Sequence, residues 1–309
     1  MQDIIIANAK YCLRQLETVA DESETRNRRL LESTARALEA LISVPGEEPL
    51  LVEIVKTAHP HMTRAGRWAE WADFLHYLLD RLDGYAETTL LLDLGAIQRR
   101  QHKVDVAVHT YQRALEISRA QQDQQVQAVA LSNLGNLYRI QGRYTAGERT
   151  CKQALDLFDA VGDRRRYAYT LNNLGLITFA RHEFDNAERR FNQAIADFVE
   201  LNDRQGQAHV LLNLGRLYRN QGALDRSRDT YLTALEHYEA LQDRLHAATT
   251  ELNLGNLYRQ MGAMQEAEAF TLRAEASYKQ LEDRLGLARA QHKPGKIYTE
   301  LREWTEARR

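Results

Sequence analysis

The 309-residue sequence contains only two cysteines and four prolines. Cys12 and Cys151 are too few for a disulfide framework, which fits a reducing compartment, so we expect a cytoplasmic location. The scarcity of proline, together with long segments rich in Ala, Leu, Glu, Arg and Gln, predicts an almost entirely helical protein.

Long apolar runs and an excess of one charge are also missing. The stretch Ile4–Ile6 is too short for a secretory signal and has no basic segment before it. No stretch reaches the roughly 20 apolar residues that a membrane-spanning helix needs. The formal net charge is −2, so no overall basic excess indicates a nucleic-acid or membrane partner.

Motifs that carry chemistry are absent as well. The sequence has no G-x-x-x-x-G-K phosphate loop, no G-x-G-x-x-G, no H-E-x-x-H and no G-x-S-x-G. The nearest thing to a metal motif is His59, Pro60 and His61, which we interpret as a surface bend at a helix end because no further ligand follows at helical spacing. We therefore expect a non-catalytic protein without a cofactor or metal ion.

What the sequence does contain is a repeat of forty residues. One glycine recurs at this step, at Gly95, Gly135, Gly175, Gly215, Gly255 and Gly295. One aspartate keeps the same step, at Asp83, Asp123, Asp163, Asp203, Asp243 and Asp283. A fixed period of this length is typical of stacked repeat arrays, which more often bind a partner along an extended surface than do chemistry in a pocket.

Residues 123–162 indicate how one unit folds. Asp123 can cap a first helix by accepting from free backbone N–H groups, and apolar residues then recur at helical spacing. Gly142 ends that helix at a short turn, and a second helix follows. Gly135 is expected where the two helices cross, because a side chain there would push them apart. Cys151 occupies a core position of the second helix, which favours burial over reactivity.

These residues resemble the tetratricopeptide repeat. The family pattern of Leu-Gly, Tyr, Ala, an aromatic and Ala appears as Leu214, Gly215, Tyr218, Ser227, Tyr231 and Ala234, with Ser227 in the place of the first alanine. The forty-residue length is similar to the long-repeat branch of kinesin light chains, the GoLoco-binding mitotic adaptor and bacterial signalling arrays. The resemblance implies an all-α fold, a right-handed superhelix (α-solenoid) of stacked helical hairpins, and a role in protein interaction.

The repeat register also predicts how the chain is organised. Residues 83–282 are expected to hold five complete repeats and residues 283–309 a partial sixth. Residues 1–82 are expected to form an N-terminal helical cap, with two amphipathic helices in 2–44 and a degenerate repeat over about 45–82. Pro294 is expected to bend or end the last first helix. The second helix of this partial repeat is expected to be missing, which leaves an open C-terminal face for another copy or a longer chain.

In this family the first helix of each hairpin lines the concave face, so the resemblance implies where a ligand binds. That face carries asparagines two residues before the repeat glycine and arginines four residues after it. The candidate ligand-binding residues are Asn133, Asn173, Asn213, Asn253, Arg99, Arg139, Arg219, Arg259, Arg216, Asn136, Asn256, Tyr169 and Phe179. Asparagine can bond the backbone of an extended peptide, arginine matches carboxylates and phosphates, and the two aromatic residues can seat an apolar anchor.

We predict a protein or peptide partner with acidic or phosphate groups, within a bacterial signalling or regulatory protein, and no membrane partner. Several alternatives stay open. The asparagines can instead bond neighbouring helices, and the arginines can pair with acids of adjacent repeats. The same groove can hold a single-stranded nucleic acid, or the open C-terminal face can drive self-association as a scaffold. The basic run Arg164–Arg166 is interpreted as a solvated helix face that Asp163 offsets.

Overall fold

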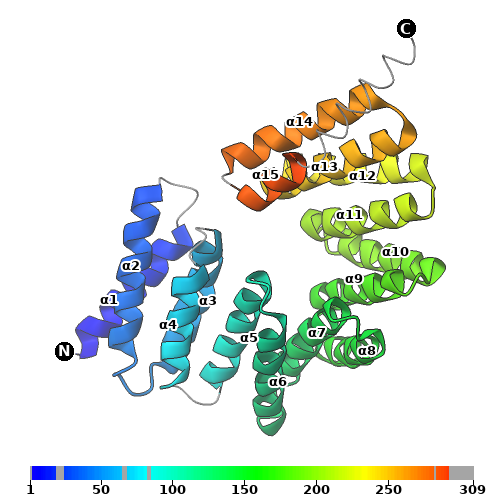
Figure 1. The fold of residues 1–309 in the computed structure, drawn as a ribbon. Helices are drawn as coiled ribbons and strands as arrows, with labels where there is room; N and C mark the ends of the chain where they lie inside the picture. The colour runs from blue at the N-terminus through cyan, green and yellow to red at the C-terminus, as the bar shows by residue number, and fades with distance from the viewer. Residues whose placement is uncertain (1, 19–23, 65–67, 82–84, 282, 292–309) are drawn as a thin grey trace. The chain divides into compact units, whose positions relative to one another are not determined.

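The structure is a computed structural model that describes residues 2–18, 24–64, 68–81, 85–281 and 283–291 (Figure 1). All regular secondary structure in these ranges is α-helical. The helices are α1 (Gln2–Thr18), α2 (Glu24–Leu41), α3 (Glu48–Arg64), α4 (Trp68–Leu79), α5 (Tyr85–Arg100), α6 (Val104–Ala120), α7 (Gln124–Ile140), α8 (Tyr144–Val161), α9 (Arg164–Ala180), α10 (Phe184–Glu200), α11 (Arg204–Asn220), α12 (Leu224–Ala240), α13 (Arg244–Met261), α14 (Met264–Gln280) and α15 (Arg284–Gln291).

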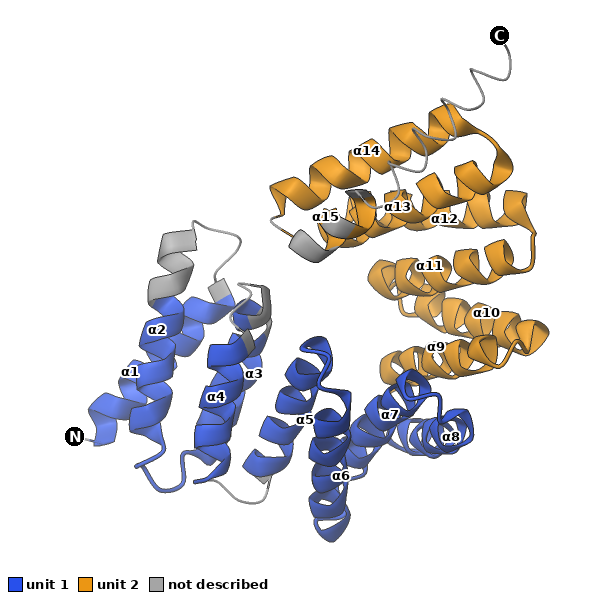
Figure 2. Cartoon of the chain, in the orientation of Figure 1, with its two compact units in different colours: residues 1–162 blue, residues 163–309 orange. Residues whose placement is uncertain are grey.

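The chain forms two compact units, Met1–Gly162 with α1–α8 and Asp163–Arg309 with α9–α15 (Figure 2). From α5 onward a helix packs mainly on the helices next to it along the chain, whereas α3 packs more on α1, α2 and α5 than on α4. The strongest pairs are α5 with α6 and α7 with α8 in the first unit, and α9 with α10, α11 with α12 and α13 with α14 in the second. This packing confirms the expected all-α architecture of stacked helical hairpins.

The repeated aspartates begin the first helices as the sequence predicts. The Asp123 carboxylate accepts a hydrogen bond of 3.0 Å from the backbone N–H of Val126. The same bond, from the aspartate to the N–H three residues on, recurs at Asp163, Asp203, Asp243 and Asp283. Gly142 lies in the turn before α8 with a φ of 74°, a conformation that glycine adopts without steric cost.

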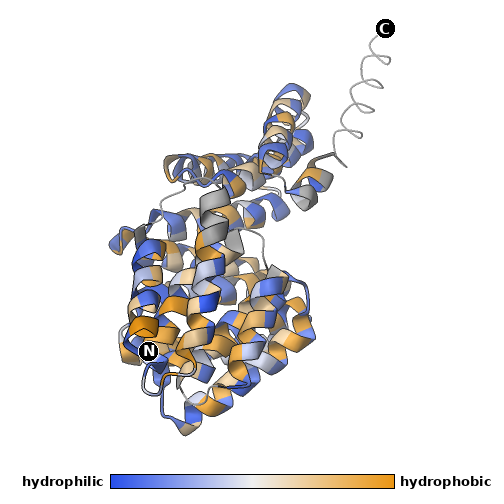
Figure 3. Cartoon of the chain, turned by 90° about the vertical axis from the view of Figure 1, so that its left-hand side faces the viewer, coloured by the Kyte–Doolittle hydropathy of each residue, from blue (hydrophilic) through white to orange (hydrophobic). Residues whose placement is uncertain are grey.

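The five repeat glycines within the described residues, Gly95 to Gly255, lie at the helix crossings. A methyl group added to Gly215 would lie 2.6 Å from Cδ1 and Cε1 of Tyr231 on α12, and one added to Gly135 would overlap the Cys151 sulfur on α8. Cys151 is fully buried, which confirms its expected place in the core. Hydrophobic and hydrophilic residues share each helix (Figure 3), because one side of the helix packs in the hairpin and the other meets solvent.

The N-terminal segment holds α1 and α2, the two helices expected there, and their core includes Leu16, Leu38 and Leu41. None of the helices within the described ranges is long and apolar enough to cross a membrane. Pro294 and the end of the expected partial repeat lie outside the described residues.

Candidate functional site

The candidate residues lie on first helices of both units. In the first unit, Arg99 lies on α5 and the others on α7, namely Asn133, Asn136 and Arg139. In the second unit they occupy α9, α11 and α13, and we call this set the first-helix face: Tyr169, Asn173, Phe179, Asn213, Arg216, Arg219, Asn253, Asn256 and Arg259. Arg216 is exposed, Asn213 is buried with 7% of its surface accessible, and the other seven are half-buried.

The asparagines differ in what they bind. Asn213 of α11 donates a 2.9 Å hydrogen bond to the side-chain oxygen of Asn172 on α9, and both residues are buried. This bond joins neighbouring first helices, so for this pair the asparagines bond an adjacent helix, which was the alternative to ligand binding. Asn133 and Asn256 instead donate to carbonyl groups one turn earlier in their own helices, at 3.0 and 2.7 Å. These three amide groups already have protein acceptors.

In the first unit Arg139 and Arg99 differ in their hydrogen bonds. The Nε and Nη2 atoms of Arg139 donate to the Asn136 side-chain oxygen at 3.2 and 2.9 Å. Arg99 has a buried Nε atom with no hydrogen-bond partner among the described residues. Within α7, Asn136 therefore accepts hydrogen bonds from Arg139, whereas the Nε atom of Arg99 on α5 has no hydrogen-bond partner among the described residues.

In the second unit Arg216 and Arg219 lie on α11 without an ion pair to any described acidic residue. The guanidinium of Arg216 lies 6.0 Å from the ring centroid of Phe179 on α9, at the limit of a cation–π contact. Arg259 on α13 has a buried Nε atom that lacks a hydrogen-bond partner in the described part of the chain. The positive charge of α11 on this face is thus not neutralised by the protein.

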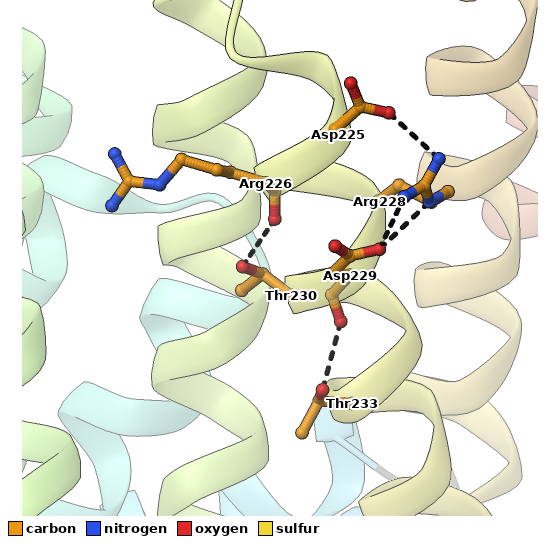
Figure 4. Close-up of polar contacts among 6 residues, drawn as sticks. All are labelled: Asp225, Arg226, Arg228, Asp229, Thr230 and Thr233. Atoms are coloured by element: carbon orange, nitrogen blue, oxygen red, sulfur yellow. Dashed lines mark hydrogen bonds and ion pairs between the residues drawn. The ribbon is translucent and has the colours of Figure 1, made fainter.

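Arginines on second helices contrast with this pattern. On α12, Arg228 contacts the carboxylates of Asp225 and Asp229, each at 2.9 Å (Figure 4). Arg226 on the same helix pairs with Glu188 of α10 at 2.6 Å. Both arginines of α12 are therefore paired with acids, unlike Arg216 and Arg219 of α11.

The basic run at the start of α9 is neutralised as well. All three arginines form ion pairs of 2.6–2.8 Å, Arg164 with Asp197, Arg165 with Asp203 and Arg166 with Asp163. The contact with Asp163 confirms that this acid offsets the run. Paired arginines have less charge available for phosphates, which argues against a nucleic-acid patch at this helix start.

The two aromatic candidates are held by aromatic neighbours. The Tyr169 ring packs edge-on against Phe198, with centroids 4.8 Å apart, and the Phe179 ring lies 6.0 Å from that of Phe184. Both side chains are half-buried. They form a fixed apolar part of the face on α9, beside the arginines of α11.

One polar cluster was missed by the sequence reasoning. His59 lies inside α3, so its interpretation as a surface bend at a helix end was wrong: its half-buried Nδ1 accepts a 3.3 Å hydrogen bond from the Trp71 indole. That bond leaves the histidine proton on Nε2. Burial, with the charge of Arg100, lowers the pKa of His59 to about 4.

Asp93 lies beside this histidine, with Oδ1 3.7 Å from Nδ1 of His59. Burial raises the pKa of Asp93 to about 7, opposed in part by Lys56. Both groups are therefore neutral over mildly acidic pH, and their contact is not an ion pair there. The signal in the sequence was that Asp93 is the single acid at a position that is asparagine in the next four repeats.

Metal chemistry has no candidate centre in the described ranges, where no group of three or more His, Cys, Asp or Glu side chains could hold an ion.

Comparisons with known proteins agree with the geometry. The family model of the tetratricopeptide repeat matches residues 126–198 and 206–280. No curated protein sequence matches the chain. Among solved structures, BtubC (BKLC) from P. vanneervenii is 24% identical, with 71% of this chain and 91% of that chain covered and a TM-score of 0.55.

Two further structures share the fold at lower identity. A Rap protein complexed with Competence and Sporulation Factor is 14% identical, with coverage of 98% and 94% and a TM-score of 0.61. PlcR of Bacillus thuringiensis, in complex with the peptide PapR7 and DNA, is 13% identical, with coverage of 75% and 85% and a TM-score of 0.58. At these identities the similarity is one of fold.

Proposed function

Because the chain belongs to the tetratricopeptide repeat family, we propose that it is a protein-interaction module that binds an extended acidic peptide segment on the first-helix face of its second unit. A single observation carries the proposal. Arg216 and Arg219 have no acidic partner among the described residues, whereas Arg226 and Arg228 of α12 and the three arginines at the start of α9 do. Guanidinium groups left in this state favour a carboxylate or phosphate brought by a partner.

The rest of the face suits a peptide. Tyr169 and Phe179 offer a half-buried apolar area beside the charge. The bond between Asn213 and Asn172 holds α9 and α11 together, so the face needs little ordering on binding. PlcR, which shares the fold, was solved with a bound peptide, and this supports the same ligand class here.

The test is a charge reversal on α11. An array of extended Glu-containing peptides and their Gln counterparts is screened, and the tightest acidic peptide is followed by fluorescence anisotropy. A hydrogen bond to a charged group contributes about 1.5–3 kcal/mol, so Arg216→Glu with Arg219→Glu should weaken binding at least about tenfold. The matched control, Arg204→Glu, changes the charge of the same helix at an exposed position outside the face.

The expected result is that only the double variant loses the acidic peptide, while its circular-dichroism spectrum stays helical. An equal loss of affinity in the Arg204→Glu variant would mean that the net charge of the protein, and not the first-helix face, determines binding. Retained affinity in the double variant places the binding surface elsewhere. Tighter binding of a single-stranded oligonucleotide than of any peptide, lost in the double variant, would replace the peptide by a nucleic acid as the ligand.

A further inference from the structure

Exposed apolar side chains gather at the connections between the repeats of the second unit. Val199 and Leu201 lie where α10 meets α11, Leu241 and Leu245 where α12 meets α13, and Leu281 directly after α14. They are five of the twelve large apolar side chains that are exposed in the described ranges, and 38–54% of the surface of each is accessible. Apolar surface gathered in this way is typical of a contact with another protein.

The connections of successive repeats lie beside one another. Each helix of this unit packs on the helices before and after it along the chain, so the second helices end on one edge of the stacked hairpins. Two ion pairs join neighbouring repeats near this edge, Arg165 with Asp203 at 2.8 Å and Arg273 with Glu239 at 3.1 Å. We call this surface the connection edge, and its exposed residues are Val199, Glu200, Leu201, Leu241, Arg244, Leu245 and Leu281.

The fold does not require these side chains. The connection between α6 and α7 has the same backbone as that between α12 and α13, with a φ of 59° at Gln122 and 54° at Gln242, and an aspartate caps the next helix in both. In the first of these connections Gln121 takes the place of the leucine and Gln124 that of the arginine. Two polar residues thus build the connection equally well, so the exposed leucines have another use.

Charged groups of opposite sign flank the apolar row in neighbouring repeats. Glu200 directly precedes Leu201, and Arg244 follows Leu241 by three residues. Both charged side chains are exposed, and neither forms an ion pair with another described residue. A row of leucines with an acid in one repeat and an arginine in the next is complementary to itself after a rotation by half a turn.

From this pattern we infer that the connection edge binds a second copy of this chain in a two-fold symmetric dimer. A two-fold contact uses the same surface of both copies. Leu201 of each copy packs on Leu241 of the other, and Glu200 of each pairs with Arg244 of the other. The leucines supply the buried apolar area, and the charges orient the two copies. The contact lies outside the first-helix face, so it does not depend on the proposed peptide ligand.

The first test removes the apolar contact in the full-length chain. Sedimentation velocity over a wide range of concentrations measures association, and circular dichroism checks the fold of each variant. Leu201→Asp with Leu241→Asp should stay monomeric at concentrations at which the wild type dimerises. The matched control is Leu272→Asp, because Leu272 is 46% exposed in the middle of α14, away from the connection edge; it should dimerise like the wild type. A monomeric wild type, or a double variant that associates as strongly as the control, would overturn the inference.

The second test examines the charge pairs. Arg244→Glu alone and Glu200→Arg alone should each raise the dissociation constant of the dimer about fivefold, because an exposed pair contributes little but occurs twice in a symmetric contact. An equimolar mixture of the two variants should associate more tightly than either variant alone, because both pairs then join opposite charges. A change in net charge or a loss of folding cannot produce this gain. No gain on mixing would refute the pairing and, with it, the dimer.

Discussion

Replacing Gly215 by alanine tests the packing that positions Tyr231. The new methyl would lie 2.6 Å from Cδ1 and Cε1 of the ring, and the ring is fully buried. Overpacking of this kind costs about 1–3 kcal/mol, against a gain of roughly 0.5–1 kcal/mol from removing glycine inside a helix. We therefore expect a net loss of up to about 2.5 kcal/mol in the free energy of unfolding, and a larger loss for leucine.

A double-mutant cycle isolates this contact. With Tyr231→Ala the obstruction is gone, so Gly215→Ala should then stabilise by about 0.5–1 kcal/mol, and the coupling energy should exceed 1 kcal/mol. Urea unfolding followed by circular dichroism gives the four free energies. Gly222→Ala is the control, because its cost comes from a φ of 78° with nothing within 4 Å and should not depend on Tyr231. A Gly215→Ala cost that is equal in both backgrounds would refute the contact.

Two further predictions concern buried polar groups. Burial raises the pKa of Asp93 from 3.8 to about 7, so the native state resists ionisation of this carboxyl group. Asp93→Asn should therefore be more stable than the wild type, by an amount that grows between about pH 4 and pH 7. The difference in the free energy of unfolding, at most about 4 kcal/mol, is measured by urea unfolding. The lowered pKa of His59 means that its protonation destabilises the fold at low pH. This effect is the same in both proteins, so it cancels from the difference. Asn213→Ala should lower the free energy of unfolding by about 1–3 kcal/mol, because it leaves the buried Asn172 oxygen without its donor. The control Asn253→Ala should melt near the wild type. Equal melting temperatures for the two variants would contradict the inter-helix bond.

The helix ends and crossings could be predicted from the sequence because they depend on local and repeated signals. An aspartate just before a helix can accept a hydrogen bond from a backbone N–H of the first turn, as Asp123 does from Val126. A glycine that recurs within the first helix indicates a close approach of the second helix, as Gly215 shows by making room for the Tyr231 ring. Each of these signals is read within one hairpin, so no knowledge of the neighbouring repeat is needed.

The state of each polar side chain on the face could not be predicted, because it depends on the neighbouring helix. Asn213 and Asn253 occupy equivalent positions, yet Asn213 is buried against Asn172 and Asn253 is half-buried. His59 and Asp93 are 34 positions apart and meet only through the packing of α3 on α5. Helical periodicity gives the direction of a side chain but not what lies opposite.

Departures from the repeat matter more for ligand choice than the repeat itself. A face with identical residues in every hairpin would bind a peptide equally well after a shift of one repeat, so it could not fix the position of the ligand. In the second unit, Phe179 breaks the arginine column on α9, and α11 carries a second arginine, Arg216, where α9 has Leu176 and α13 has Asn256. An apolar ligand residue placed at Phe179 and an acidic one placed at Arg219 therefore define a single register. A peptide with these two residues exchanged should bind more weakly than the original order, although its composition and charge are the same.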